Sequence, residues 1–111
     1  MLHALNYLHK KNVVHRDLKL DNIMVDLEKS QNDDRKTKIV CKVTDFGFAK
    51  ALEKDQKETL TLGTPHYMAP ELVKRQAYDS KVDIWALGVL TYMILVGKEP
   101  FRGRTQAEIF Q

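Results

Sequence analysis

One short segment of this 111-residue chain gathers the side chains whose types and spacing could support chemistry. Residues 13–26 read VVHRDLKLDNIMVD, so charges of both signs lie between apolar residues that look buried. Asp17, Lys19 and Asn22 supply a carboxylate, an ammonium group and an amide close together. A carboxylate can accept a proton or bind a cation, and an ammonium group can neutralise an anion. The segment is therefore a candidate site for chemistry on charged groups, and the alternative is an ordinary polar turn.

Further motifs, in a fixed order along the chain, narrow this chemistry. HRDLKLDN at residues 15–22 matches the pattern His-Arg-Asp-Leu-x-x-x-Asn, which is typical of the catalytic loop of protein kinases. DFG follows at residues 45–47, GTPHYM at 63–68, APE at 69–71 and DIWALGV at 83–89. Each motif alone is weak, but their order and spacing together are specific. Over nearly its whole length the chain resembles the C-terminal lobe of a eukaryotic-type protein kinase.

The resemblance assigns the polar residues roles in phosphoryl transfer, a reaction in which the protein mainly positions groups and neutralises charge. By resemblance, Asp17 is catalytic and accepts or orients the proton of the substrate hydroxyl. Lys19 is catalytic as well and steadies the transferred phosphate. Asn22 and Asp45 are the expected ligands of Mg²⁺, which prefers oxygen ligands. Thr64 is expected to approach Asp17 and Lys19.

ATP is the nucleotide that the same resemblance implies. The residues expected to bind it are Lys19, Asn22, Met24, Thr44 and Asp45. Met24 matches the position that forms the floor under the adenine, and Thr44 lies near the same ring. For both residues, a plain role in the core or in a strand is the alternative interpretation.

Residues 45–71, from DFG to APE, correspond by resemblance to the activation segment of a kinase. Arg16 resembles the arginine that binds a phosphorylated activation segment, a task for which the arginine fork is well suited. The usual phosphate acceptor lies four residues before the Thr of GTP, where this chain has Leu60, flanked by Thr59 and Thr61. We expect a phosphate at Thr59 or Thr61 in the active protein; the alternative is that no such phosphate is necessary.

Two further expectations concern residues that support the catalytic loop. Asp83 stands three residues after Ser80, which is the spacing of a capping box at a helix start. By resemblance, Asp83 also bonds the backbone around His15 and Arg16, and both interpretations can hold together. His15 is expected to stack with Phe46 in the hydrophobic interior rather than to act as a general base.

The elements that must carry these residues can be predicted from pattern. Apolar positions from Met1 to Lys11 recur at helical spacing, and Asn12 can close that helix. NIMV at residues 22–25 and KIVCKVTDF at 38–46 are predicted as short strands. The charge-rich segment from Asp26 to Lys38 is predicted as a long exposed hairpin loop.

The second half of the chain is predicted to be mainly helical. Residues 50–64 lack a sustained period, which indicates a long loop. A short helix is expected from Pro70, and a central helix runs from its N-cap at Ser80 to Gly97. A capping box starts a final helix at Thr105.

These elements indicate an α+β fold: a mainly helical C-terminal kinase lobe with a short β-hairpin, and with the N-terminal lobe absent. We expect residues 1–111 to form one partial kinase domain. None of the five glycines forms the G-x-G-x-x-G loop that covers nucleotide phosphates in kinases. The 111 residues alone are therefore expected to bind ATP poorly and to transfer phosphate negligibly.

Composition limits the partners and the compartment. A net charge of +3 with dispersed Lys and Arg argues against a dedicated nucleic-acid binder. Cys41 is the only cysteine and is predicted to be a small core residue; its isolation fits a reducing compartment, so we expect an intracellular, cytoplasmic protein. The apolar run at residues 84–96 is too short to span a membrane.

The expected function is ATP-dependent phosphoryl transfer to serine or threonine of a protein substrate. HRDLK together with GTPHYMAPE looks like the serine/threonine type, and GVLTYMILVGKEPF resembles calcium/calmodulin-type and calcium-dependent kinases. One alternative is a pseudokinase-like or truncated binding module without catalysis, although the four polar residues at 17, 19, 22 and 45 are intact. Another is a small-molecule phosphotransferase, against which GTP followed by APE argues. The regulator and the physiological substrate stay open.

Overall fold

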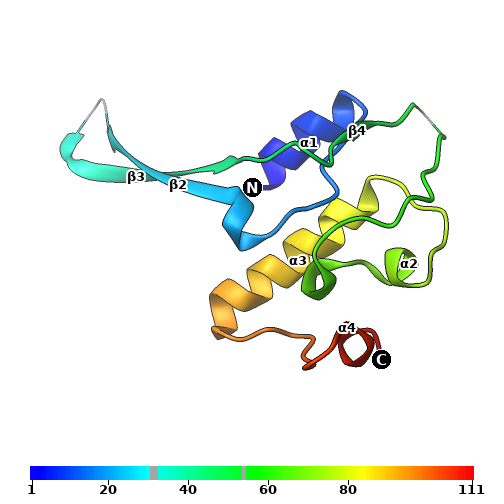
Figure 1. The fold of residues 1–111 in the computed structure, drawn as a ribbon. Helices are drawn as coiled ribbons and strands as arrows, with labels where there is room; N and C mark the ends of the chain where they lie inside the picture. The colour runs from blue at the N-terminus through cyan, green and yellow to red at the C-terminus, as the bar shows by residue number, and fades with distance from the viewer. Residues whose placement is uncertain (31–32, 54) are drawn as a thin grey trace.

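Short helices and two small antiparallel sheets make up the fold, in agreement with the predicted α+β class (Figure 1). The computed structural model describes residues 1–30, 33–53 and 55–111. Its elements are, in order, α1 (Leu2–Lys10), β1 (Val13–Val14), the 3₁₀ turn η1 (Leu20–Asn22), β2 (Ile23–Ser30), β3 (Asp33–Val43), β4 (Lys50–Ala51), the 3₁₀ turn η2 (Pro65–Tyr67), α2 (Pro70–Val73), α3 (Lys81–Val96) and α4 (Gln106–Ile109).

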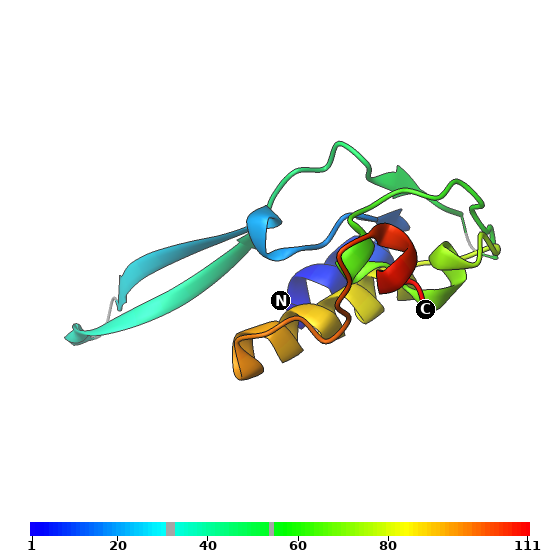
Figure 2. The ribbon, with the colours of Figure 1, turned by 60° about the horizontal axis from the view of Figure 1, so that its bottom comes forward.

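The segment predicted as a polar hairpin loop is mostly strand. β2 and β3 pair in antiparallel register from Ile23 opposite Val43 to Lys29 opposite Thr37. Both views show this hairpin projecting away from the helices (Figure 1, Figure 2). The prediction of a loop from 26 to 38 is therefore wrong, apart from residues 31 and 32, which lie outside the described residues. Between Leu27 and Ile39 the sequence lacks the apolar alternation that marks a half-buried strand, so pattern alone did not predict the pairing there.

The same projection explains the position of Cys41. Val25, Leu27 and Ile39, its neighbours in the hairpin, are 61%, 66% and 67% exposed. Cys41 is exposed as well, so the prediction of a small core residue is wrong. Apolar side chains in a strand are buried only where another element covers the strand, and sequence pattern alone does not reveal that cover.

α1 forms and ends as its sequence predicts. Asn12 adopts a left-handed conformation with φ of 59°, and its N–H donates to the carbonyl of His9 at 2.9 Å. Asparagine tolerates this conformation better than most residues, which is why it closes helices. The buried Leu5 places α1 in a core cluster shared by Leu5, Leu18, Ala86 and Leu87.

α3 is the central helix, and it ends at the predicted residue. Gly97 is left-handed, with φ of 71°, and its N–H donates to the carbonyl of Met93 at 2.8 Å. Ser80 stands at the N-cap, but its side chain makes no capping hydrogen bond. α4 starts as predicted, because the Thr105 side chain accepts a bond from the N–H of Glu108 at 3.3 Å. Among the described helices, none has the length and apolar character that crossing a membrane requires.

The predicted long loop at residues 50–64 is anchored at two places. β4 pairs with β1 through Val13 opposite Ala51, and Glu58 forms an isolated antiparallel bridge with Tyr78. α2 begins at Pro70, as the sequence predicts. A second core cluster lies beneath this part of the chain and contains Val14, Leu52, Ala69, Leu72, Tyr78 and Val82.

Candidate functional site

The loop of residues 15–22 is fixed by a carboxylate from α3. Asp83 is 1% exposed, and its Oδ2 and Oδ1 accept the backbone N–H groups of His15 and Arg16, each at 2.9 Å. The Nε2 of His9 in α1 lies 2.8 Å from the same Oδ2. The contact expected by resemblance is confirmed, whereas the capping box with Ser80 is wrong, because the carboxylate faces the loop instead of the helix start.

Three polar side chains meet at the centre of the site. The hydroxyl of Thr64 donates to Oδ1 of Asp17 at 2.8 Å. Lys19 lies between them, with its Nζ 3.2 Å from Oδ2 of Asp17 and 3.3 Å from the Thr64 hydroxyl oxygen. Asp17 is 8% exposed. The activation segment and the loop therefore converge on one carboxylate, as the sequence predicts for Thr64.

Asn22 joins this cluster to the end of β3. Its Nδ2 donates to the Asp17 carbonyl at 2.8 Å and lies 3.4 Å from Oδ2 of the same residue. The N–H and the hydroxyl of Thr44 both donate to the Asn22 carbonyl, at 2.9 and 3.1 Å. The backbone next to Asp45 is thereby held against the loop of residues 15–22.

Asn22 and Asp45 fit a hard cation by the chemistry of their donor atoms. The amide nitrogen of Asn22 is directed at Asp17, so the amide oxygen is the atom left for a cation. Asp45 is exposed, and its Oδ1 accepts the N–H of Gly47 at 3.1 Å. In the described part of the chain, no three His, Cys, Asp or Glu side chains form a metal-binding group. Two oxygen ligands suit Mg²⁺, which commonly keeps waters and substrate phosphates as its other ligands.

The residues predicted to lie near a nucleotide base differ in their environment. Met24 in β2 is 57% exposed, so a plain core role for it is excluded. Thr44 is half-buried, and its carbonyl accepts a bond from Nε2 of His15 at 2.9 Å. His15 is buried and meets Phe46 edge-on, with ring centroids 5.1 Å apart. The predicted contact between these two rings is confirmed, but Phe46 is 45% exposed, so the prediction that the pair lies in the hydrophobic interior holds for His15 alone. His15 packs against Phe46 and makes hydrogen bonds to the backbone.

Arg16 lies at the junction of three segments. It has φ of 70°, an uncommon conformation for a residue with a side chain. Its Nε donates to the Phe48 carbonyl at 2.5 Å, and its Nη1 lies 3.4 Å from the Tyr78 hydroxyl and 3.6 Å from Oε2 of Glu58. The side chains of Arg16 and Glu58 are 8% and 11% exposed.

Glu58 is the residue that the sequence interpretation missed. Its carboxylate also pairs with Lys50 of β4, and it accepts the N–H groups of Thr59 and Leu60 at 2.8 and 3.1 Å. These hydrogen bonds, led by the one from Lys50, lower the pKa of Glu58 from 4.5 to about 2. The available signal was an acidic residue directly before the expected phosphate position, in a segment that looked like an ordinary loop.

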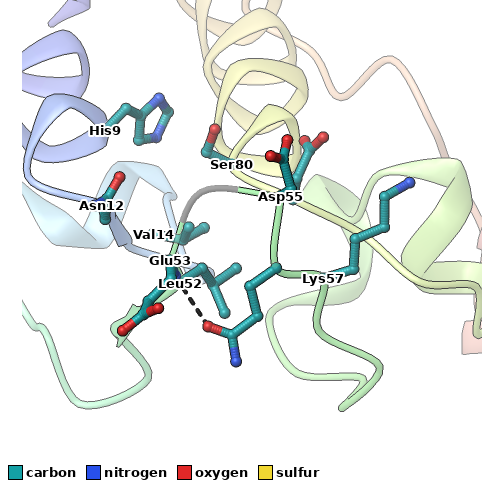
Figure 3. Close-up of a pocket in the computed structure, with 10 residues that line it drawn as sticks. His9, Asn12, Val14, Leu52, Glu53, Asp55, Lys57 and Ser80 are labelled. Atoms are coloured by element: carbon teal, nitrogen blue, oxygen red, sulfur yellow. Dashed lines mark hydrogen bonds between the residues drawn. The ribbon is translucent and has the colours of Figure 1, made fainter.

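A separate pocket of about 370 Å³ lies away from this cluster (Figure 3). It opens between the end of α1, the loop after β4 and the start of α3, with His9, Leu52 and Ser80 among its walls. None of the predicted catalytic or nucleotide-binding residues lines it. The candidate chemistry therefore stays with the cluster around Asp17.

Comparisons with known proteins identify relatives of the chain. The model of the protein kinase domain family matches residues 1–111. The serine/threonine-protein kinase CLA4 of Saccharomyces cerevisiae is 42% identical over 99 residues, covering 88% of this chain and 11% of the relative. A probable myosin light chain kinase of Dictyostelium discoideum is 41% identical over 97% of this chain and 26% of its own length. A cAMP-dependent protein kinase catalytic subunit-like protein of Caenorhabditis briggsae is 46% identical over 96% of this chain and 25% of its own length.

Proposed function

Because the chain belongs to the protein kinase domain family, we propose that it provides the part with the catalytic loop of a serine/threonine kinase that phosphorylates proteins with ATP and Mg²⁺. The chain spans between 11% and 26% of the length of the three curated relatives described above. In this proposal residues 1–111 are part of the C-terminal lobe. Relatives named as serine/threonine kinases support the choice of hydroxyl acceptor.

The observation that carries the proposal is the meeting of Asp17, Lys19 and Thr64. Asp17 receives a hydroxyl donor at 2.8 Å from Thr64. A serine or threonine hydroxyl of a substrate carries the same kind of donor, and the carboxylate is the group that would accept or orient its proton. Lys19, 3.2 Å from that carboxylate, would neutralise charge on the transferred phosphoryl group.

Asn22 and Asp45 would complete the site by holding Mg²⁺. The cation would supply positive charge that neutralises the nucleotide phosphates. Asn22 is buried and bonded to the Asp17 backbone, so its position relative to the carboxylate is fixed. The Thr44 bonds to Asn22 tie Asp45 to the same loop. Met24 and Thr44 would contribute to the adenine side of the nucleotide, and the protein substrate would meet the loop from the side of Thr64.

The test is a peptide-phosphorylation assay on the natural protein that carries this chain, with Mg²⁺ and ATP. Asp17→Asn should lower kcat on the order of 10²- to 10⁴-fold, the usual contribution of a positioned general base. Asp26→Asn is the control, since it removes an exposed carboxylate from the hairpin, away from the cluster. A protein that binds nucleotide but phosphorylates no peptide would instead be the non-catalytic binding module.

The 111 residues by themselves should fail in this assay. They carry no glycine-rich loop of the G-x-G-x-x-G type, which covers the phosphates in kinases. Transfer by the purified chain that disappears with Asp17→Asn would contradict this expectation.

A further inference from the structure

We propose that Glu58 is a built-in anion that orders the activation segment and positions the catalytic loop through Arg16, so that activity needs no phosphate on Thr59 or Thr61. This inference rests on the proposed kinase function, which it deepens by naming how the site is switched on. It assigns Glu58 as a positioning residue, because its carboxylate acts through Arg16 rather than on substrate.

Two cations surround the carboxylate of Glu58. The carboxylate pairs with Lys50 of β4 and lies 3.6 Å from Arg16 of the catalytic loop. Lys50 belongs to the strand that pairs with β1, directly before the catalytic loop. A single carboxylate therefore contacts the loop directly through Arg16 and, through Lys50 in β4, the strand that precedes the loop.

The backbone around Glu58 is also held by hydrogen bonds. Its N–H donates to the Tyr78 carbonyl at 3.0 Å, and the N–H of Tyr78 donates back at 2.9 Å. Oε1 of Glu58 accepts the amides of Thr59 and Leu60, and the Tyr78 hydroxyl donates to the Leu60 carbonyl at 2.8 Å. Main chain and side chain thus hold residues 58–60 in one conformation.

Arg16 connects Glu58 to Asp17. Arg16 precedes Asp17, and its own N–H is bound by Asp83. Glu58 and the Phe48 carbonyl hold its guanidinium, so both ends of Arg16 are fixed. Since Arg16 has a strained φ of 70°, loss of the guanidinium contacts would free the backbone at the catalytic carboxylate to move.

Glu58 already makes the contacts that a phosphate on the activation segment would make. A phosphorylated activation segment is ordered when the phosphate pairs with arginine and accepts backbone N–H groups. Here a carboxylate already neutralises Arg16 and Lys50 and already accepts two consecutive amides. A phosphate at Thr59 or Thr61 would have to compete with Glu58 for the same partners.

Activity assays on the natural protein separate the two possibilities. Glu58→Gln keeps the size and removes the charge, so kcat should fall on the order of ten- to a hundredfold through misplacement of the loop, while KM for ATP stays unchanged. Glu58→Asp should recover part of kcat, because the charge is restored at a shorter reach. Glu53→Gln, which removes an exposed carboxylate of the same segment, should leave kcat unchanged.

The phosphate arm uses the wild-type protein after phosphatase treatment, with mass spectrometry to verify that Thr59 and Thr61 are unmodified. This enzyme and the Thr59→Ala/Thr61→Ala variant should keep the wild-type kcat. Loss of activity in either, or full activity of Glu58→Gln, would overturn the proposal.

A structural readout keeps this test independent of the proposed function. Amide hydrogen exchange should be slow at Thr59 and Leu60 in the wild type and fast in Glu58→Gln. If no form of the protein phosphorylates any peptide, the kinase function fails, and the exchange result alone then decides whether Glu58 orders the segment. Equal exchange rates in the two forms would refute that ordering role.

Discussion

At the scale of single residues, Gly63 shows how closely the segment of residues 45–71 approaches the loop of residues 15–22. Its φ is 117°, and a Cβ atom at this position would lie 2.9 Å from the carbonyl oxygen of Arg16. Backbone and contact both demand glycine here. The GTP motif is thus explained partly by close packing against the residue before Asp17, and only partly by the hydroxyl of Thr64.

Gly63→Ala should therefore destabilise the fold by roughly 1–3 kcal/mol, the usual cost of a residue held in an unfavourable conformation. Urea denaturation measures this change. Gly88→Ala is the matched control, since a Cβ there meets nothing within 4 Å and α3 is regular at that point. That variant should be stabilised by roughly 0.5–1 kcal/mol, because alanine is the better helix former. Equal effects of both substitutions would contradict the close approach at Gly63.

Asp83 is a second residue whose role is set by distant partners. Asp83→Asn keeps one acceptor oxygen for two backbone N–H groups, so one buried donor loses its partner. The free energy of unfolding should fall by about 1–3 kcal/mol, the cost of an unsatisfied buried group. Asp26→Asn breaks an ion pair whose two side chains are half-exposed, and should change stability little. Similar losses in the two variants would argue that the buried bonds of Asp83 contribute nothing.

At the scale of elements, the anchoring of the activation segment should depend on pH. The groups that face Glu58 are Arg16, Lys50 and the Tyr78 hydroxyl. Because the pKa of Glu58 falls from 4.5 to about 2 on folding, its contribution to folding stability is fully present above pH 4.5. It is lost as the pH falls from 4.5 toward 2, since the folded state must then take up the proton.

Thermal unfolding of the wild type and of Glu58→Gln between pH 7 and pH 2 checks this linkage. The difference in Tm between them should be constant near neutral pH and should shrink below pH 4.5. A difference that stays constant down to pH 2 would show that the charge of Glu58 has no part in stability.

What the sequence could predict at this scale follows from the range of each signal. Local signals were sufficient for the end of α1 at Asn12 and for the end of α3 at Gly97, because a helix end depends on its own few residues. Order and spacing of motifs were sufficient to predict that Thr64 approaches Asp17. The contacts of Glu58 depend on Arg16 and Tyr78, which lie far away along the chain, so no local sequence pattern predicts them.

The β2–β3 hairpin is an element that the sequence pattern did not predict in full. Its strands are built by backbone pairing, and polar side chains on both faces are compatible with that pairing. A sequence pattern reports the burial of side chains and is silent on the pairing of backbones, so a solvated hairpin looks like a loop. Cys41 was assigned too much burial for the same reason.

At the scale of the whole molecule, the chain is extended for its length. Its radius of gyration is 15.8 Å, against about 13 Å expected for a compact domain of roughly 100 residues. Part of the excess comes from the projecting hairpin (Figure 2). α3 is mostly apolar around its circumference, yet only one of its sides is buried in this structure. A helix of that composition is normally enclosed by protein.

The exposed side of α3 should promote association of the chain. Ile94, Leu95 and Val96 are 64%, 79% and 48% exposed, whereas Leu90 is 2% exposed. Apolar surface of this kind binds apolar dyes and promotes association. Leu95→Lys should reduce dye fluorescence and the aggregated fraction in sedimentation, and should change the free energy of unfolding by less than about 0.5 kcal/mol, as is usual for surface substitutions.

Leu90→Lys is the matched contrast on the same helix. It places a charge in the core and should unfold the chain, because a buried unpaired ammonium group is strongly disfavoured. If Leu95→Lys were as damaging as Leu90→Lys, the outer side of α3 would have to be covered within this chain, contrary to its exposure. If Leu95→Lys keeps the fold and lowers association, the free apolar side of α3 is the cause of the association.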